Sequence, residues 1–184
     1  RETMSFSSVA ETRTTLETAG YICTREIATV VFLAARTQKP ILVEGPAGVG
    51  KTELAKAVSR SLNREMIRLQ CYEGLDEAKA LYEWKYGKQL LYTQVLKETL
   101  GEILEGARGL SESVDKLHSF GDVFFSKEFL EPRPLLKALE AEEGCVLLID
   151  EVDKSDHEFE SLLLEMLSDY QLSIPEIGTV KAIP

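Results

Sequence analysis

The chain has 184 residues, 44% of them hydrophobic and 28% charged, and a formal net charge of −10. A domain of this size can bury a good core, and no apolar run approaches the ~18 residues of a membrane span. The negative charge, without a basic stripe, disfavours nucleic acid as a partner. The N-terminus is polar, and the three cysteines are well separated, so we expect no membrane association and a cytoplasmic protein with reduced thiols.

The first half of the chain alternates between expected helices and strands. Thr24 is placed to cap a helix that runs to about residue 37 with one apolar face. Residues 40–44 form a short, branched apolar run, which predicts a buried parallel strand. Residues 53–63 have helical periodicity, and residues 66–72 alternate like a strand.

The second half continues the α/β order. Its expected elements are a weak helix at 76–82, a stronger helix at 93–105, a loop or insertion at 106–121, a short helix at 134–143, a buried strand at 145–151, a helix opened by a Ser155–Glu158 capping box, and a hairpin over 171–183 with Gly178 inside it.

A complete phosphate-binding loop, G-x-x-x-x-G-K-T, follows the expected strand at 40–44. Its glycines allow the backbone N–H groups to turn toward a phosphate, Lys51 supplies a positive charge for the β- and γ-phosphates, and Thr52 offers a hydroxyl to Mg²⁺. The helix that begins beside it presents its N-terminus to the same anion. The predicted nucleotide-binding residues are Gly45, Pro46, Ala47, Gly48, Val49, Gly50, Lys51, Thr52 and Glu53.

Two acids end the expected strand at 145–151, at the sheet edge where α/β proteins bind ligands. Asp150 is predicted to hold Mg²⁺ opposite Thr52. Glu151 is predicted to orient or polarise the attacking water, with Lys51 as the second catalytic residue. The adjacent Asp-Glu pair favours hydrolysis of ATP over binding alone. The chain contains neither an N-K-x-D guanine reader nor an L-S-G-G-Q signature, which disfavours a GTPase and an ABC-type transporter subunit.

Several blocks of sequence resemble the MoxR branch of the AAA+ ATPases. They are ILVEGPAGVGKTE at 41–53, RLQCYEGLD at 68–76, LIDEVDK at 148–154 and LSDYQLSIPE at 167–176. The resemblance implies a three-layer αβα P-loop NTPase core with a mostly parallel sheet, here truncated before the sensor strand and the helical lid. It divides the chain into an N-terminal extension (1–22) and a partial ATPase domain (23–184), with an insertion-bearing region at 72–130 and a pre-sensor hairpin starting at 171–184.

The same resemblance implies a function and partners. Family members form rings, typically hexamers, that use ATP to remodel proteins. They work beside a von Willebrand factor A-domain protein and often mature metalloenzymes. The family's sensor Asn, arginine finger and lid would follow Pro184, and its sensor strand would lie between the strand at 40–44 and the acidic strand. We therefore expect a fragment of a longer protein, a gap in the sheet, and weak or absent turnover by this chain alone.

Other interpretations fit some of the same residues. A nucleic-acid-dependent AAA+ ATPase and a nucleotide-gated binding module without turnover are the competing functions. Arg108 and Arg133 are candidate substitutes for an arginine finger, weighed against solvated or ion-paired roles. The aromatic residues Tyr82, Trp84 and Tyr86 fit either a partner-gripping element or a half-buried strand. Asp153 and Lys154 are expected in a solvated turn.

Overall fold

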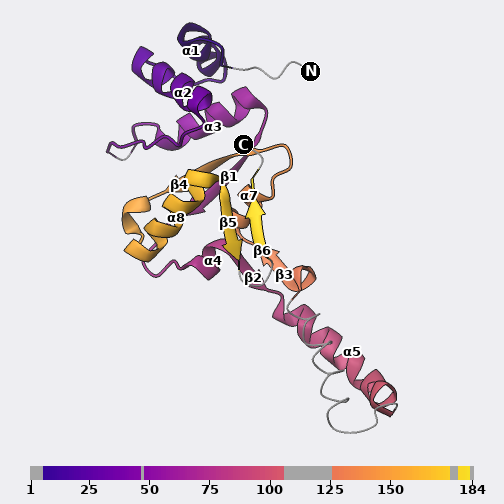
Figure 1. The fold of residues 1–184 in the computed structure, drawn as a ribbon. Coiled ribbons are helices and arrows are strands. Elements are labelled where there is room, and N and C mark those ends of the chain that lie inside the picture. The colour runs from indigo at the N-terminus through magenta and orange to yellow at the C-terminus, as the bar shows by residue number, and fades with distance from the viewer. Residues whose placement is uncertain (1–5, 47, 106–125, 175–177, 183–184) are drawn as a thin grey trace.

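The computed structural model describes residues 6–46, 48–105, 126–174 and 178–182, and these residues form helices and short strands around two separate cores (Figure 1). The first core belongs to three N-terminal helices. The second lies between a parallel strand pair and helices that come between and after the two strands in the chain. The phosphate-binding loop is attached to the first core and the acidic strand to the second.

Three helices build the first core: α1 (Val9–Thr18), α2 (Arg25–Thr37) and α3 (Lys51–Leu62). As predicted, Thr24 caps α2, where its hydroxyl accepts the N–H of Ile27 at 3.3 Å. The buried residues of this core are Phe6, Leu16, Cys23, Ala28, Val31, Leu54 and Ala57. Burial of these apolar side chains fixes α3, and with it one end of the phosphate loop, against α1 and α2.

Helix α1 was not expected from the sequence. Its first turn is capped by Ser8, whose hydroxyl accepts the N–H of Glu11 at 3.2 Å. The fully buried Leu16 and Thr12 then anchor one face of the helix to the first core. Packing of this face outweighs the low helix propensity of a Thr-rich segment.

A parallel pair, β1 (Glu65–Gln70) with β4 (Cys145–Asp150), carries the second core. The helices α7 (Pro134–Leu139) and α8 (His157–Asp169) pack on it. The register places Gln70 opposite Asp150. The buried residues of this core are Leu69, Cys71, Leu75, Ala80, Leu81, Leu130, Leu135, Leu136, Leu139, Phe159, Leu163, Met166, Leu172 and Ile174. The predicted α/β class and the parallel pairing of the acidic strand are confirmed.

The strand predicted for residues 40–44 does not form. This segment is not a strand, and most of its side chains are exposed, with Leu42 74% and Val43 41% accessible, while Ile41 is half-buried against the first core. The prediction of a buried strand was wrong because an apolar run becomes a strand only beside a partner that accepts its hydrogen bonds. Within the described residues β4 pairs with β1 alone, and because segment 40–44 is not a strand, the gap expected between two strands of one sheet stays a prediction.

Two antiparallel pairs complete the described strands. One joins β2 (Tyr82–Trp84), which follows α4 (Glu77–Leu81), to β3 (Leu130–Pro132), which follows a 3₁₀ turn at Lys127–Phe129. The other is the predicted hairpin, β5 (Gln171–Ile174) with β6 (Gly178–Lys181). The predicted loop at 106–121 lies outside the described residues.

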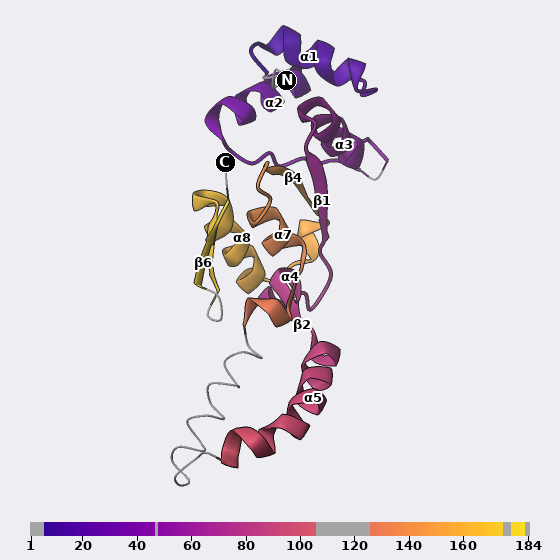
Figure 2. The ribbon, with the colours of Figure 1, turned by 90° about the vertical axis from the view of Figure 1, so that its right-hand side faces the viewer.

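Helix α5 (Tyr86–Glu105) extends away from the rest of the chain in both views (Figures 1 and 2). At 1.5 Å per residue its 20 residues span about 30 Å. It begins seven residues earlier than the predicted helix at 93–105. None of the helices in the described ranges is both long and apolar enough to cross a membrane.

The capping of α8 differs from the prediction. Asp156, rather than Ser155, is the N-cap, and its carboxylate accepts the N–H of Phe159 at 2.9 Å. Ser155 instead donates its hydroxyl hydrogen to the carbonyl of Val152. The 3₁₀ turn after β4 uses Ser155, which moves the helix start one residue along the chain.

Candidate functional site

The phosphate-binding loop has the backbone conformation that its glycines were expected to provide. Gly45 has φ +149°, and a Cβ on it would meet the Val49 side chain at 3.2 Å. Gly50 has φ +91° and is the N-cap of α3. Side chains at these positions would strain the backbone or crowd the loop. Gly48 also has positive φ, Pro46 lies in a bend, and Ala47 lies outside the described residues.

The loop ends in a helix N-terminus suited to an anion. The first bond of α3 runs from the N–H of Leu54 to the carbonyl of Gly50, at 3.0 Å, so the N–H groups of residues 51–53 have no acceptor within the helix. The Lys51 ammonium donates to the Gly45 carbonyl across the loop. The Glu53 carboxylate lies 2.7 Å from Lys56 Nζ, and this hydrogen bond and charge lower its pKa. The loop thus presents amides and a lysine, the donors that a phosphate requires.

Asp150 lies at the carboxyl end of β4 with both carboxylate oxygens engaged. Oδ2 is 2.6 Å from Nη2 of Arg68, and Oδ1 accepts the N–H of Glu151 at 3.1 Å. Its side chain is 22% exposed. The backbone carbonyl of Asp150 accepts the N–H of Cys71 at 2.9 Å. Burial raises the pKa of the Cys71 thiol, and the nearby Asp150 carboxylate raises it further.

Glu151 occupies an unusual backbone conformation. Its φ of +55° lies in the left-handed region, where a residue with a side chain is disfavoured by about 1–3 kcal/mol. Its carboxylate pairs with Lys154, at the end of the 3₁₀ turn Val152–Lys154. The hydrogen bond to Glu151 raises the pKa of Lys154. The turn expected at Asp153 and Lys154 therefore also supplies the ion-pair partner of the predicted catalytic acid, since Lys154 pairs with Glu151.

The structure brings the two halves of the predicted site into neighbouring elements, since α3 lies against β4. Within the described residues, no side-chain hydrogen bond or ion pair joins the phosphate loop to Asp150 or Glu151. Among the described residues, Lys51 bonds only within the loop, Asp150 bonds to β1 and to the next residue, and Glu151 bonds to Lys154. A bound group would have to connect the halves. A lysine, helix amides, the Thr52 hydroxyl and the Asp150 carboxylate fit a nucleotide phosphate with Mg²⁺.

Arg68 is the site residue that sequence reasoning missed. Its side chain reaches both Gln70 Oε1, at 2.8 Å, and Asp150 Oδ2. A signal was present: the alternation of β1 puts Arg68 and Gln70 on one face of a strand that ends beside the acidic residues. The pairing of β1 with β4 was needed to read it.

The other candidates have local roles. Arg133 pairs with Glu83 across β2 and β3, as the alternative interpretation held, and Arg108 lies outside the described residues. Tyr82 and Trp84 are half-buried in β2 and meet edge to face, with ring centroids 5.7 Å apart. This geometry favours the strand interpretation for those two residues. Tyr86 is 68% exposed at the start of α5.

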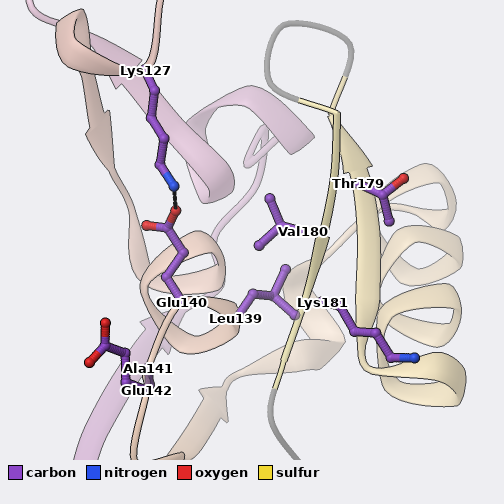
Figure 3. Close-up of a pocket in the computed structure, with 8 residues that line it drawn as sticks. All are labelled: Lys127, Leu139, Glu140, Ala141, Glu142, Thr179, Val180 and Lys181. Carbon is purple, nitrogen blue, oxygen red and sulfur yellow. Dashed lines mark ion pairs between the residues drawn. The ribbon is translucent and has the colours of Figure 1, made fainter.

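A separate hollow of about 590 Å³ lies between the end of α7 and β6 (Figure 3). Lys127 and Glu140 form an ion pair on one side, and Leu139 and Val180 lie close to each other on the side of β6. None of the phosphate-loop or acidic-strand residues lines this hollow. It is therefore distinct from the candidate nucleotide site.

Comparison with known proteins places this site in a family. The AAA domain (dynein-related subfamily) matches residues 40–184. Lon protease 1 of Syntrophobacter fumaroxidans (strain DSM 10017 / MPOB) is 47% identical over 55 residues, which are 29% of this chain and 7% of that protein. The chain thus matches only a small part of the length of this curated relative. No solved structure matches. Because the family match covers most of the chain and includes the phosphate loop and the acidic strand, the chain belongs to the dynein-related subfamily of AAA domains.

Proposed function

We propose that this chain binds ATP with Mg²⁺ and hydrolyses it to ADP and phosphate. The observation that supports this most directly is the phosphate loop. Its glycines have positive φ, it leads into the N-terminus of α3, and that helix lies against the strand that ends in Asp150 and Glu151. Membership of the AAA domain family supports nucleotide binding at this loop.

Each residue has a stated role in the proposal. The amides of the loop and Lys51 hold the phosphates, while the Thr52 hydroxyl and the Asp150 carboxylate hold Mg²⁺. The ion, when bound, supplies positive charge beside the phosphate oxygens. Glu151 accepts a hydrogen bond from the attacking water and orients it. Lys154 bonds one carboxylate oxygen of Glu151, Oε2, and Oε1 is the oxygen that would accept this hydrogen bond.

We further propose that the hydrolysis drives remodelling of a protein partner. This proposal rests on the similarity to MoxR-type ATPases of the sequence blocks at 41–53, 68–76, 148–154 and 167–176. The similarity supports assembly into a ring, which is hexameric in that family. It also supports a von Willebrand factor A-domain partner and a metalloenzyme client in the cytoplasm. Protease activity is not proposed, because the match to the Lon protease spans 7% of that protein.

A second candidate is a nucleotide-gated binding module without turnover. The observation in its favour is that both predicted catalytic acids are already paired, Asp150 with Arg68 and Glu151 with Lys154. A nucleic-acid-dependent ATPase is disfavoured by the net charge of −10.

Replacement of Glu151 by Gln tests the proposed function. We expect ATP binding within about threefold of the original and hydrolysis slowed by about 10²-fold or more, because an amide is a poor acceptor for the proton of water. Asp153→Asn is the matched control, because it neutralises an acid two residues after Glu151. It should leave the rate of ATP hydrolysis unchanged. The measurements are phosphate release and titration with a fluorescent ATP analogue, with and without DNA and RNA.

The outcomes separate the candidates. Binding without phosphate release by the unaltered chain would favour the nucleotide-gated module. Stimulation by DNA or RNA would favour the nucleic-acid-dependent ATPase. An absence of binding would overturn the assignment of the phosphate loop.

A further inference from the structure

Arg68 stands out because it neutralises the residue that the proposed site needs for a metal ion. The alternating burial of β1 leaves Ile67 and Leu69 buried, with Leu69 in the second core, and places Arg68 and Gln70 on the opposite, exposed face. Arg68 Nη2 lies 2.6 Å from Asp150 Oδ2. The contact is a charge-assisted hydrogen bond between a guanidinium and a carboxylate. It connects residues 82 positions apart in the chain.

The arrangement gives Arg68 a second place to bind. The same Nη2 atom is 2.8 Å from Gln70 Oε1, and Gln70 is the register partner of Asp150. The guanidinium can therefore release the carboxylate and remain bonded to the neighbouring amide oxygen. Its side chain is 50% exposed, so this movement is not blocked by packing. The other carboxylate oxygen, Oδ1, keeps its bond to the N–H of Glu151.

We propose that Arg68 is the counter-ion of Asp150 in the absence of a divalent cation, and that it sets the magnesium affinity of the nucleotide site by competing for this carboxylate. The inference rests on the proposed function, because it takes Asp150 as a magnesium ligand. Arg68 acts through Asp150 and is therefore a positioning residue. It does not contact the nucleotide in this proposal.

The size of the effect follows from charge and exposure. A cation within a few ångströms of the carboxylate disfavours a second cation there, and the partial exposure of both side chains reduces the repulsion. We expect Arg68→Gln to lower the magnesium concentration for half-saturation by about 3- to 10-fold, on these principles. Lys at this position keeps the charge, so Arg68→Lys should stay within about twofold of the original value.

The experiment measures binding rather than turnover. A fluorescent ADP analogue is titrated into the chain at increasing magnesium concentration, and the half-saturating concentration is compared among variants. Arg13→Gln is the matched control, because Arg13 is 53% exposed and lies 2.8 Å from the Glu17 carboxylate on α1, a helix that carries no residue of the site. It should leave the half-saturating concentration unchanged. With Asp150→Asn, further replacement of Arg68 should have no effect.

An unchanged or raised half-saturating concentration in Arg68→Gln would overturn this inference while leaving the proposed function intact. A persistent effect of Arg68→Gln in the Asp150→Asn background would also overturn it, because the competition requires the carboxylate. If the unaltered chain bound the nucleotide without any dependence on magnesium, both the inference and the magnesium role of Asp150 would fail. A complete lack of nucleotide binding would overturn the proposed function with it.

Discussion

The phosphate loop and the acidic strand are supported in different ways. The acidic strand β4 is hydrogen-bonded along its length to β1 and lies on the second core, next to the fully buried Leu135 and Leu136. The segment before the phosphate loop pairs with none of the strands in the described ranges, and Leu42 is 74% exposed there. The loop is fixed mainly from its other end, through α3 and the first core. One half of the candidate site therefore depends on a sheet and the other on a helix.

The largest expected effect on stability comes from the core beneath the acidic strand. Leu136 is fully buried in α7, and Leu136→Ala should lower the free energy of unfolding by about 2–5 kcal/mol, because it removes apolar contacts and leaves a cavity. Urea denaturation followed by circular dichroism measures the change.

The matched substitution in the segment before the phosphate loop is Leu42→Ala. Because Leu42 is largely exposed, we expect a loss below about 0.5 kcal/mol. A loss of several kcal/mol at Leu42 would break the comparison, because it would mean that segment 40–44 is buried in solution as the sequence alone predicted.

The same contrast explains which parts of the fold the sequence could predict. The capping of α2 by Thr24 and the turn that the loop glycines make depend on neighbours a few residues away, and both were predicted. The strand at 40–44 was wrong because its existence depends on a partner strand, which the local pattern does not contain. The sequence pattern predicted the local structure correctly only where that structure depends on contacts between residues close in the sequence.

Helix α1 and Arg68 were also missed because the contacts that decide them are not local in the sequence. The Thr-rich α1 was missed because its stability comes from packing of Leu16 and Thr12 against other helices. Arg68 was missed because its partner, Asp150, lies far along the chain and meets it only through the β1–β4 pairing. The candidate residues Lys51, Thr52, Asp150 and Glu151 came from motifs, whereas the contacts that restrain Asp150 and Glu151 came from the structure.

Lys51→Ala should separate binding from stability. The side chain is partly exposed and bonds to the Gly45 carbonyl, so its loss should change the free energy of unfolding by less than about 1 kcal/mol. Nucleotide affinity should fall at least about 100-fold, or ~2.7 kcal/mol, because the main charge facing the phosphates is removed. Isothermal titration with ATP measures the affinity.

Lys56→Ala is the control for this change. Lys56 lies one turn further along α3, is paired with Glu53, and should leave affinity within about twofold. Equal losses in the two variants would show that the general positive charge of α3, rather than Lys51, determines binding.

A small effect is expected at a hydrogen bond that joins helices of the two cores. Tyr170, at the end of α8, donates its hydroxyl hydrogen to the carbonyl of Gln38, at the end of α2, over 2.7 Å. Tyr170→Phe removes this bond while keeping the ring, and since the contact is exposed we expect a loss of about 0.5–1 kcal/mol. Tyr72→Phe is the control, because within the described part of the chain the Tyr72 hydroxyl has no hydrogen-bond partner. If Tyr170→Phe also lowered hydrogen-exchange protection in α2 and α8 together, the bond would couple the two cores, whereas a loss confined to either helix would mean that each core is stabilised separately.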